Sequence, residues 1–307
     1  MSSNTYTAID LSLLSPPDVV KQIDFETILK EGLEDFYQRM RKVQPDFPDL
    51  LESDPAMKLA EAFAYREMLV RNDANQQALS VLLAYAEGAD LDHKAAERNL
   101  QRRIIFPATE NTPEVKESNE SLRRRVQLAP EGYTTAGSEG SYIYHGLNAD
   151  ARVKDIYPFA PLDENGNGNG ICNIYVLSAD GDGSASEELI NTVNATLNKK
   201  QIRPATDFVK VYSASVQNYS VEAELIIEEG PDSGIILKSA IQKLEEYVKT
   251  VHSFGDGVAI SGIYAALQQP GVTRVHLITP TVDVQNSIGQ VAFCTSLKVT
   301  VKGDTNG

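Results

Sequence analysis

Apolar residues recur at three- and four-residue steps between residues 55 and 86, a spacing that predicts an amphipathic helix. At a rise of about 1.5 Å per residue, an unbroken helix of this length would be about 48 Å long, whereas the mean helix has about 11 to 12 residues. Two ordinary helices broken at Asn72 and Asp73 are the alternative. Either way we expect an assembly core rather than a reaction site, because the segment pairs no nucleophile with a base.

Both ends of this segment carry helix signals. Ser53 or Asp54 can accept hydrogen bonds from the first free amide groups, and Pro55 suits the first turn of a helix. Gly88 can adopt the left-handed backbone conformation that ends many helices. These signals predict one helix that begins at Pro55 and ends at Ala86.

One side of the predicted helix is a stripe of small and apolar side chains that only Glu67 interrupts. Small side chains let two helix backbones approach closely, so we interpret the stripe as a surface that packs against helices of other chains. Packing inside this chain is the alternative. The stripe consists of Ala56, Ala60, Phe63, Val70, Ala74, Ala78, Val81 and Tyr85.

The rest of the pattern divides the chain into an arm and three further regions. The first residues are polar and end in Pro16 and Pro17, which predicts an extended arm. A helix from Asp24 and the long helix then predict a helical core, and the polar stretch 109–119 predicts a loop where the next domain begins. The predicted divisions are 1–17, 18–108, 109–204 and 205–307.

Strands and helices alternate after residue 109. In the middle domain the pattern predicts helices at 120–129, 138–148 and 186–198, and two strands joined as a hairpin by a glycine-rich tip at 163–170.

The C-terminal domain continues this alternation. It reads as two strands between residues 207 and 228, a helix at 233–252, a short helix from Ser261 and two last strands. The candidate inward positions of the first two strands are Phe208, Val209, Val211, Tyr219, Val221, Leu225 and Ile227. The predicted fold is therefore α+β and multidomain, with a long-helix bundle region followed by two small mixed α/β domains.

Composition narrows the function. The net charge of −15 argues against nonspecific nucleic-acid binding, which needs clustered Lys and Arg. Cys172 and Cys294 lie far apart in apolar runs, so we expect two buried thiols from a reducing compartment. No apolar run approaches the length of a membrane-spanning helix, and the N-terminus lacks signal-peptide features, so we expect folding in a cytoplasm and no membrane insertion.

Candidate chemistry is sparse. The loop from Asp163 opens like a calcium loop, but Ile174 stands where the bidentate Glu belongs. The four histidines are not at metal-ligand spacing, and no catalytic constellation is recognisable, so we expect no metal, cofactor or catalytic residue. The densest basic cluster is Arg123, Arg124 and Arg125 on a predicted helix, which is either a solvated face or a docking surface for an acidic partner.

Several stretches, in order along nearly the whole chain, resemble the baseplate-J-like family, the wedge proteins of contractile phage tails and related injection machines. The matching stretches are LSPPDVVKQIDFETIL, ESDPAMKLAEAFAYREMLVRNDANQQALSVLLAYAEGADLD, SLRRRVQLAPEGYTTAGSEGSYIYHGLNADARVKDI, RPATDFVKVYSASVQNY and SGIYAALQQPGVTRVHL.

This resemblance implies a structural role in the virion tail baseplate. It implies that the helical part bundles with a second copy and with another wedge protein of the I-like type, and that the C-terminal part meets the next wedge. Further implied partners are a W-like sheath initiator and the neighbouring wedges of a six-fold ring, which would hold the tail ready and transmit receptor binding to the sheath. Such a role needs hinges, for which residues 132–137, 230–231 and 253–257 are candidates.

Two other functions stay open from the sequence. A tail-associated enzyme that degrades cell walls would be a compact monomer with a carboxylate-lined cleft. The absence of Trp and of any catalytic spacing counts against an enzyme. A soluble assembly chaperone would leave the finished particle.

Overall fold

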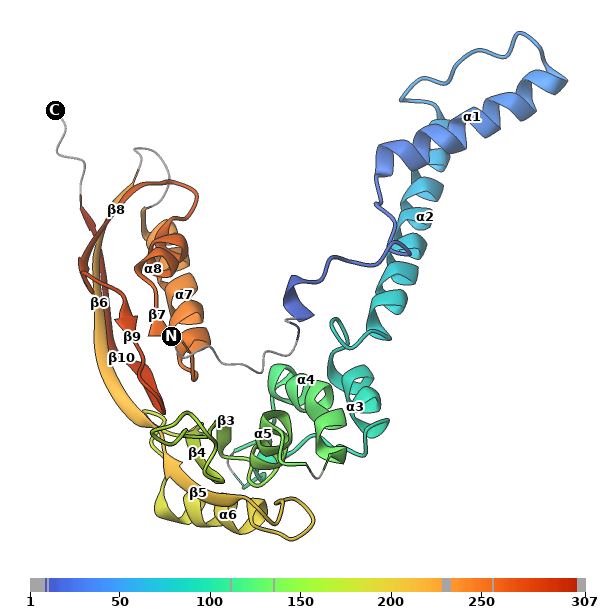
Figure 1. Cartoon of the computed structure of the whole chain (residues 1–307). Coiled ribbons are helices and arrows are strands. Elements are labelled where there is room, and N and C mark those ends of the chain that lie inside the picture. Colours follow the sequence, from blue (N-terminus) through green and yellow to red (C-terminus); the bar gives the residue numbers. More distant parts are fainter. Residues whose placement is uncertain are drawn as a thin grey trace. The chain divides into compact units, whose positions relative to one another are not determined.

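A computed structural model describes residues 9, 11–110, 112–134, 136–227, 233–255 and 257–302. The chain forms two compact units. Ile9–Gln101 make up a helical unit, and the residues from Arg102 onward make up a unit of mixed helices and sheets (Figure 1). The predicted α+β class is confirmed, whereas the four predicted divisions stay a prediction. No described helix is long and apolar enough to cross a membrane.

The helical unit contains a 3-10 turn, η1 (Leu11–Leu13), and the helices α1 (Phe25–Val43), α2 (Pro55–Ser80) and α3 (Gly88–Ala96). Asp24 caps α1, because its carboxylate accepts a hydrogen bond from the backbone N–H of Thr27 at 2.9 Å. α1 lies across the first half of α2 (Figure 1), where Ile28 and Ala64 are buried.

The long helix differs from its prediction at its C-terminus. α2 is continuous through Asn72 and Asp73, which confirms one helix there and excludes the alternative of two helices broken at these residues. It ends at Ser80 rather than at residue 86, because the N–H of Leu82 bonds back to Leu79 and tightens the chain into three-residue turns. Gly88, with a φ of +50°, begins α3 instead of ending α2.

The second unit begins with a two-stranded antiparallel ribbon, β1 (Ile104–Phe106) and β2 (Val115–Lys116), and continues with α4 (Asn119–Leu128), η2 (Ala129–Tyr133) and α5 (Glu139–Leu147). Ser118 caps α4 and Ser138 caps α5, each accepting a hydrogen bond from the N–H three residues on. The predicted loop at 109–119 was wrong in part, because β2 lies within it.

A three-stranded sheet follows, made of β3 (Val153–Phe159), β4 (Ile171–Ser178) and β5 (Phe208–Ser213), with α6 (Glu187–Leu197) between β4 and β5. The strand order is β3-β4-β5; β3 and β4 form the predicted antiparallel hairpin, and β5 runs parallel to β4. One face of the sheet packs on α5 and α6 in a core that includes Leu147, Ile174 and Val193. Phe208 is 63% exposed and does not point inward as predicted.

The last sheet has the order β10-β6-β8, in which β10 (Gln290–Lys302) is parallel and β8 (Val272–Thr279) antiparallel to β6 (Ser215–Ile227). α7 (Ser233–Val251) and α8 (Ile260–Leu267) pack on one face of this sheet, against Val221 and Leu225 among others. Glu222 and Glu224 are partly exposed and pair with lysines of β10. A short pair, β7 (Gly257–Val258) and β9 (Val284–Gln285), completes the unit.

Candidate functional site

The predicted stripe on α2 is only partly covered by its own chain. Phe63 and Val70 are 65% and 66% exposed, Ala56 and Ala74 are exposed, and Ala60 and Ala78 are half-buried. The structure therefore leaves an apolar helix face open along much of α2. Large exposed apolar surfaces of this kind mark interaction sites in soluble proteins.

Two stripe residues lie beyond the helix because α2 ends at Ser80. Val81 is 60% exposed in the turn that follows. Tyr85 uses its hydroxyl group to donate a hydrogen bond to the backbone carbonyl of Leu14 at 2.8 Å. The sequence pattern placed both residues on the helix face, and the structure corrects this.

The first half of the stripe faces α1 across an unfilled groove of about 260 Å³. Its apolar walls come from α1, α2 and the connection between them, and Glu67 is the single charged group among its described lining residues. The groove shows that α1 covers this end of α2 incompletely. Its lining residues are Ile28, Leu29, Gly32, Phe36, Leu50, Ala56, Leu59, Ala60, Phe63, Ala64 and Glu67.

The segment before α1 lies against the second half of α2. Asn75 exchanges two hydrogen bonds with the backbone of Lys21, at 3.2 and 2.8 Å. Arg71 lies near Glu31 of α1, with 3.8 Å between nitrogen and oxygen. These polar contacts orient α1 and the preceding segment on α2 without burying its apolar residues.

The helical unit has a small hydrophobic core. Many of its large apolar side chains that the structure describes are exposed, including Leu59, Tyr65 and Leu69 on α2, and most of the others are only half-buried. Folding is driven mainly by burial of apolar surface, so a unit with so few buried side chains gains little stability by itself. Its described buried apolar residues are Ile28, Ala64, Ala86, Leu91, Ala95 and Leu100.

The three consecutive arginines of α4 have different surroundings. Arg123 is half-buried, Arg124 is exposed and Arg125 is buried. Successive helical residues point about 100° apart, so three in a row cannot share one face. The interpretation of the triplet as a single docking or solvated face is therefore wrong for Arg125, because its side chain is buried inside the chain.

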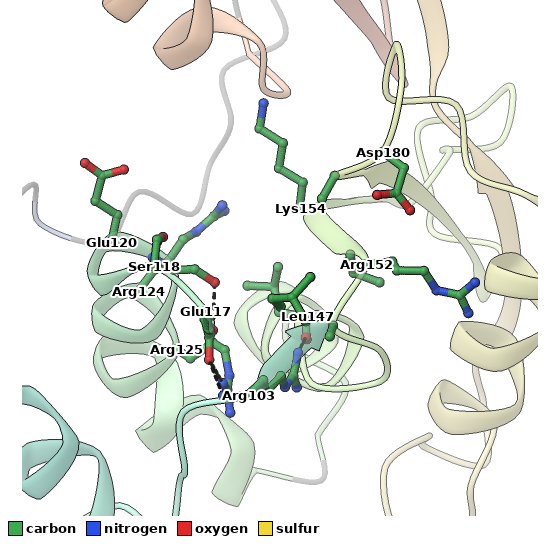
Figure 2. Close-up of a pocket in the computed structure, with 15 residues that line it drawn as sticks. Arg103, Glu117, Ser118, Glu120, Arg124, Arg125, Leu147, Arg152, Lys154 and Asp180 are labelled. Carbon is green, nitrogen blue, oxygen red and sulfur yellow. Dashed lines mark hydrogen bonds and ion pairs between the residues drawn. The ribbon is translucent and has the colours of Figure 1, made fainter. Parts of the chain in front are cut away.

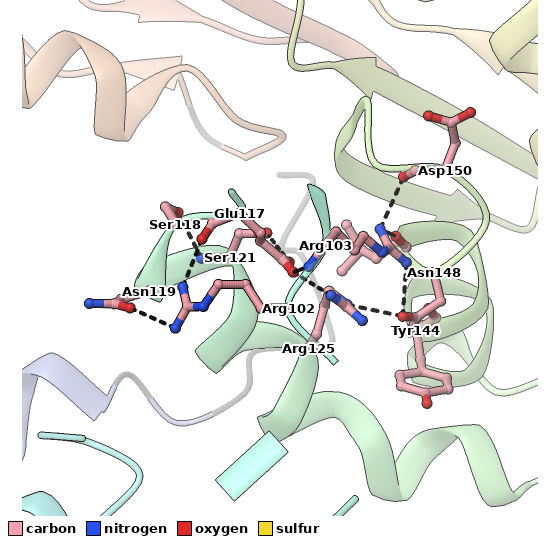
Figure 3. Close-up of polar contacts among 11 residues, drawn as sticks. Arg102, Arg103, Glu117, Ser118, Asn119, Ser121, Arg125, Tyr144, Asn148 and Asp150 are labelled. Carbon is pink, nitrogen blue, oxygen red and sulfur yellow. Dashed lines mark hydrogen bonds and ion pairs between the residues drawn. The ribbon is translucent and has the colours of Figure 1, made fainter. Parts of the chain in front are cut away.

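Arg125 forms an ion pair with Glu117, whose carboxylate also accepts hydrogen bonds from Ser121 Oγ at 2.7 Å and from the N–H of Arg103 at 3.2 Å. Asn148 Oδ1 accepts hydrogen bonds from both Arg125 Nε and Arg103, each at 3.0 Å (Figure 3). The network therefore joins the segment before β1, the first turns of α4 and the end of α5.

The Arg103 guanidinium is held by the end of α5. It donates to the backbone carbonyls of Leu147 and Asp150 at 2.8 and 3.1 Å, which are acceptors near the negative end of the helix dipole. Burial and the positive charge of Arg125 lower the pKa of Arg103. Sequence analysis missed Glu117 and Arg103, because neither belongs to an apolar repeat or a motif.

A second polar cluster joins the middle sheet to α4 and to the segment after α7. Asp155 on β3 is buried; its Oδ1 accepts a hydrogen bond from Arg124 at 2.6 Å, and its Oδ2 accepts one from the N–H of Phe254 at 3.2 Å. The ring of Phe254 stacks on Tyr157 with 5.6 Å between centroids. The segment after α7, which contains one of the predicted hinges, thus contacts the middle sheet through Phe254.

His252 belongs to the same junction. Its Nδ1 lies 3.2 Å from Lys154 Nζ and its Nε2 lies 3.2 Å from the carbonyl oxygen of Asp182. Burial, together with the positive charge of Lys154, lowers the pKa of His252. The neutral imidazole accepts a hydrogen bond from the lysine and donates one to the carbonyl.

The glycine joint near Gly132 is also tightly packed, since a Cβ there would meet the ring of Tyr144. The third predicted hinge, at 230–231, lies outside the described residues. The three hinges stay predictions.

The structure also shows the surroundings of the calcium-like loop from Asp163 and of the two cysteines. Asp163 Oδ1 accepts hydrogen bonds from the N–H groups of Asn165 and Asn167, at 2.9 and 2.8 Å, as in a turn. Across the described residues no group of three or more potential ligands gathers around one point. Cys172 and Cys294 are unpaired thiols, and burial raises the pKa of Cys172 to about 12.

Comparison with known families identifies the class of protein. Models of the baseplate J-like N-terminal domain, the baseplate J-like central domain and the baseplate J-like protein C-terminal domain match residues 52–109, 134–213 and 219–300. The chain belongs to the baseplate J-like family, which confirms the resemblance seen in the sequence. Among curated proteins it is similar to baseplate protein J of Escherichia phage P2, with 40% identity over 302 residues that cover 96% of this chain and 98% of the relative.

Among solved structures, a cryo-electron-microscopy structure of the anti-feeding prophage baseplate, six-fold symmetrised, is similar at 13% identity and a TM-score of 0.42. The match covers 63% of this chain and 47% of that one.

Proposed function

We propose that this chain is a structural wedge protein in the baseplate of a contractile phage tail or a tail-like injection particle. In this role it assembles into a six-fold ring around the tube and spike, and it couples a change in the baseplate to contraction of the sheath. Membership of the baseplate J-like family supports the structural role.

The open apolar face of α2 is the observation that carries this proposal. Phe63 and Val70 are each about two-thirds exposed, and few described side chains of the helical unit are buried. Further helices packed on this face would bury the apolar surface that the chain leaves in water. We assign the face to a second copy of this chain and to a wedge protein of the I-like type.

The other partners of the proposed assembly meet the second unit. The C-terminal domain, residues 205–307 in the predicted division, would contact the neighbouring wedge, and a W-like protein would link the ring to the sheath. Residues 132–137, 230–231 and 253–257 are the proposed joints about which packed parts rotate. None of these roles requires catalysis, a cofactor or a metal ion.

The proposal is tested by measuring the protein composition of purified particles by quantitative mass spectrometry. We expect the chain in intact particles, at two copies for each copy of a wedge protein that occurs once per wedge. Absence of the chain from finished particles would contradict the proposal and support an assembly chaperone.

A further inference from the structure

Next to the buried Arg125–Glu117 pair lies a cavity of about 480 Å³, between the first turn of α4 and the start of β3 (Figure 2). Its described lining residues include five cationic side chains and three carboxylates, although the chain as a whole has a net charge of −15. The cavity is therefore a local concentration of positive charge. The cationic residues are Arg103, Arg124, Arg125, Arg152 and Lys154.

Three of these cations are already satisfied within the chain. Arg125 pairs with Glu117. Arg152 is held by Asp150 at 2.9 Å and by Glu188 at 3.2 Å. The guanidinium group of Arg103 donates hydrogen bonds to acceptors at the end of α5. These three groups shape the wall and raise its potential, but they are not available to a ligand.

Lys154 is different, because no described carboxylate forms an ion pair with it. Its Nζ contacts only the imidazole of His252, at 3.2 Å, so two of its three N–H donors have no partner among the described residues. Burial lowers the pKa of Lys154, which means that the folded chain disfavours the charged form of this amine. A carboxylate next to the ammonium group would favour the charged form again.

Arg124 lines the same cavity and also has spare donors. It gives one hydrogen bond, to Asp155, among the described residues, whereas a guanidinium has five N–H groups. In Figure 2 Arg124 projects from α4 and Lys154 from β3, on two sides of the cavity. The first turn of α4 also lines the cavity, so the positive end of the helix dipole adds to the field.

We propose that this cavity receives one carboxylate, the side chain of an Asp or Glu on a loop of a partner protein, and holds it between Arg124 and Lys154. Charge-assisted hydrogen bonds to both cations would fix its position. Nucleic acid does not fit, because Glu120 and Asp180 line the same cavity and the chain repels an extended polyanion. This inference rests on the proposed function in one respect: it needs a partner protein.

Carbodiimide cross-linking of intact particles tests the inference, because the reagent joins an amine only to a carboxylate in contact with it. After digestion, mass spectrometry is expected to show the Lys154 peptide joined to an Asp or Glu of another chain. Lys154→Arg keeps the charge but has no primary amine, and it is expected to remove this cross-linked peptide. Cross-links from Lys154 only to carboxylates of its own chain, or none at all, would overturn the inference while leaving the proposed function intact.

Two charge-reversal variants, one in the cavity and one at an exposed control site, give an independent test. Lys154→Glu is expected to lower incorporation of the chain into particles by about tenfold or more, because a buried interfacial charge would then face a like charge. Lys200→Glu makes the same charge change at an exposed site and is the control, expected to assemble normally. Equal incorporation of the two variants would refute the inference. Absence of the wild-type chain from particles would instead refute the proposed function on which it rests.

Discussion

Arg125 and Glu117 form an ion pair in which the two side chains are 6% and 3% exposed, which makes it the most buried of the ion pairs between described residues. Buried charges are tolerated only when they are paired and hydrogen-bonded. Here Ser121, Asn148 and Arg103 supply the remaining partners. The pair therefore fixes the start of α4 against the end of α5.

Removing one member of this pair is expected to destabilise the second unit strongly. Glu117→Gln would leave the buried guanidinium group of Arg125 without its carboxylate, and we expect a loss of about 3 to 5 kcal/mol in the free energy of unfolding. Denaturant unfolding measures this change. The double variant Glu117→Leu with Arg125→Met removes both charges and is expected to recover part of the loss, whereas strictly additive losses would show that the two groups do not interact.

The sequence contained enough information for most elements but not for this pair. The sequence predicted helices at 120–129 and 138–148, close to the observed α4 and α5, and the glycine-rich tip at 163–170 predicted the hairpin of β3 and β4. Arg125 was read as a surface residue because charge alone suggests solvent exposure. Its burial depends on Glu117, which directly precedes the capping residue Ser118 and is hydrogen-bonded to the backbone of Arg103.

The end of α2 shows a second limit of sequence reasoning. Leu82, Leu83 and Tyr85 continue the apolar spacing past Ser80, so periodicity could not reveal that the backbone changes to tighter turns there. The stripe itself was predictable, because helical periodicity depends on residues close in sequence. Which helices cover the stripe depends on other chains, and the sequence of this chain alone does not identify them.

Asp155 is expected to hold the segment after α7 in place. Asp155→Ala would leave the buried N–H of Phe254 without its acceptor and release Arg124, at a cost of about 1 to 3 kcal/mol. Hydrogen exchange should rise at residues 253–258 more than elsewhere in the unit. Glu164→Ala, at the exposed hairpin tip, is the control, and equal exchange in both variants would argue against this role of Asp155.

Stability is expected to fall as the pH drops below about 6.5, the ordinary pKa of histidine. The pKa of His252 is lowered in the folded chain, so the unfolded chain binds the proton more readily and unfolding is favoured as the pH falls toward the folded value. Lys154 and Asp182 are the charged residues whose fields act on the imidazole.

Thermal unfolding between pH 8 and pH 5 measures this effect. His252→Gln should show a smaller loss over that range than the wild type. A residual slope is expected from His145, whose pKa burial also lowers. Identical slopes in the variant and the wild type would contradict the assignment to His252.

Gly289, at the turn before β10, is expected to tolerate no side chain. Its φ is +68° and an added Cβ would meet the ring of Tyr175 on β4, so Gly289→Ala should cost about 1 to 3 kcal/mol. Gly168→Ala is the matched control, because nothing lies within 4 Å of its added Cβ; we expect a change within about 0.5 kcal/mol. Denaturant midpoints of the two variants decide between these expectations.

The central claim is that the open face of α2 joins this chain to other chains. The most direct test is light scattering coupled to size-exclusion chromatography, on the chain alone and after coexpression with the protein encoded next to it. The variants are Val70→Glu with Ala74→Glu on the open face, and Gln76→Glu as a control on the far side of the same helix.

We expect a complex of two copies of this chain and one partner, lost in the double variant and kept in the control. A compact monomer that does not bind the partner, or a complex that still forms with the double variant, would contradict the claim.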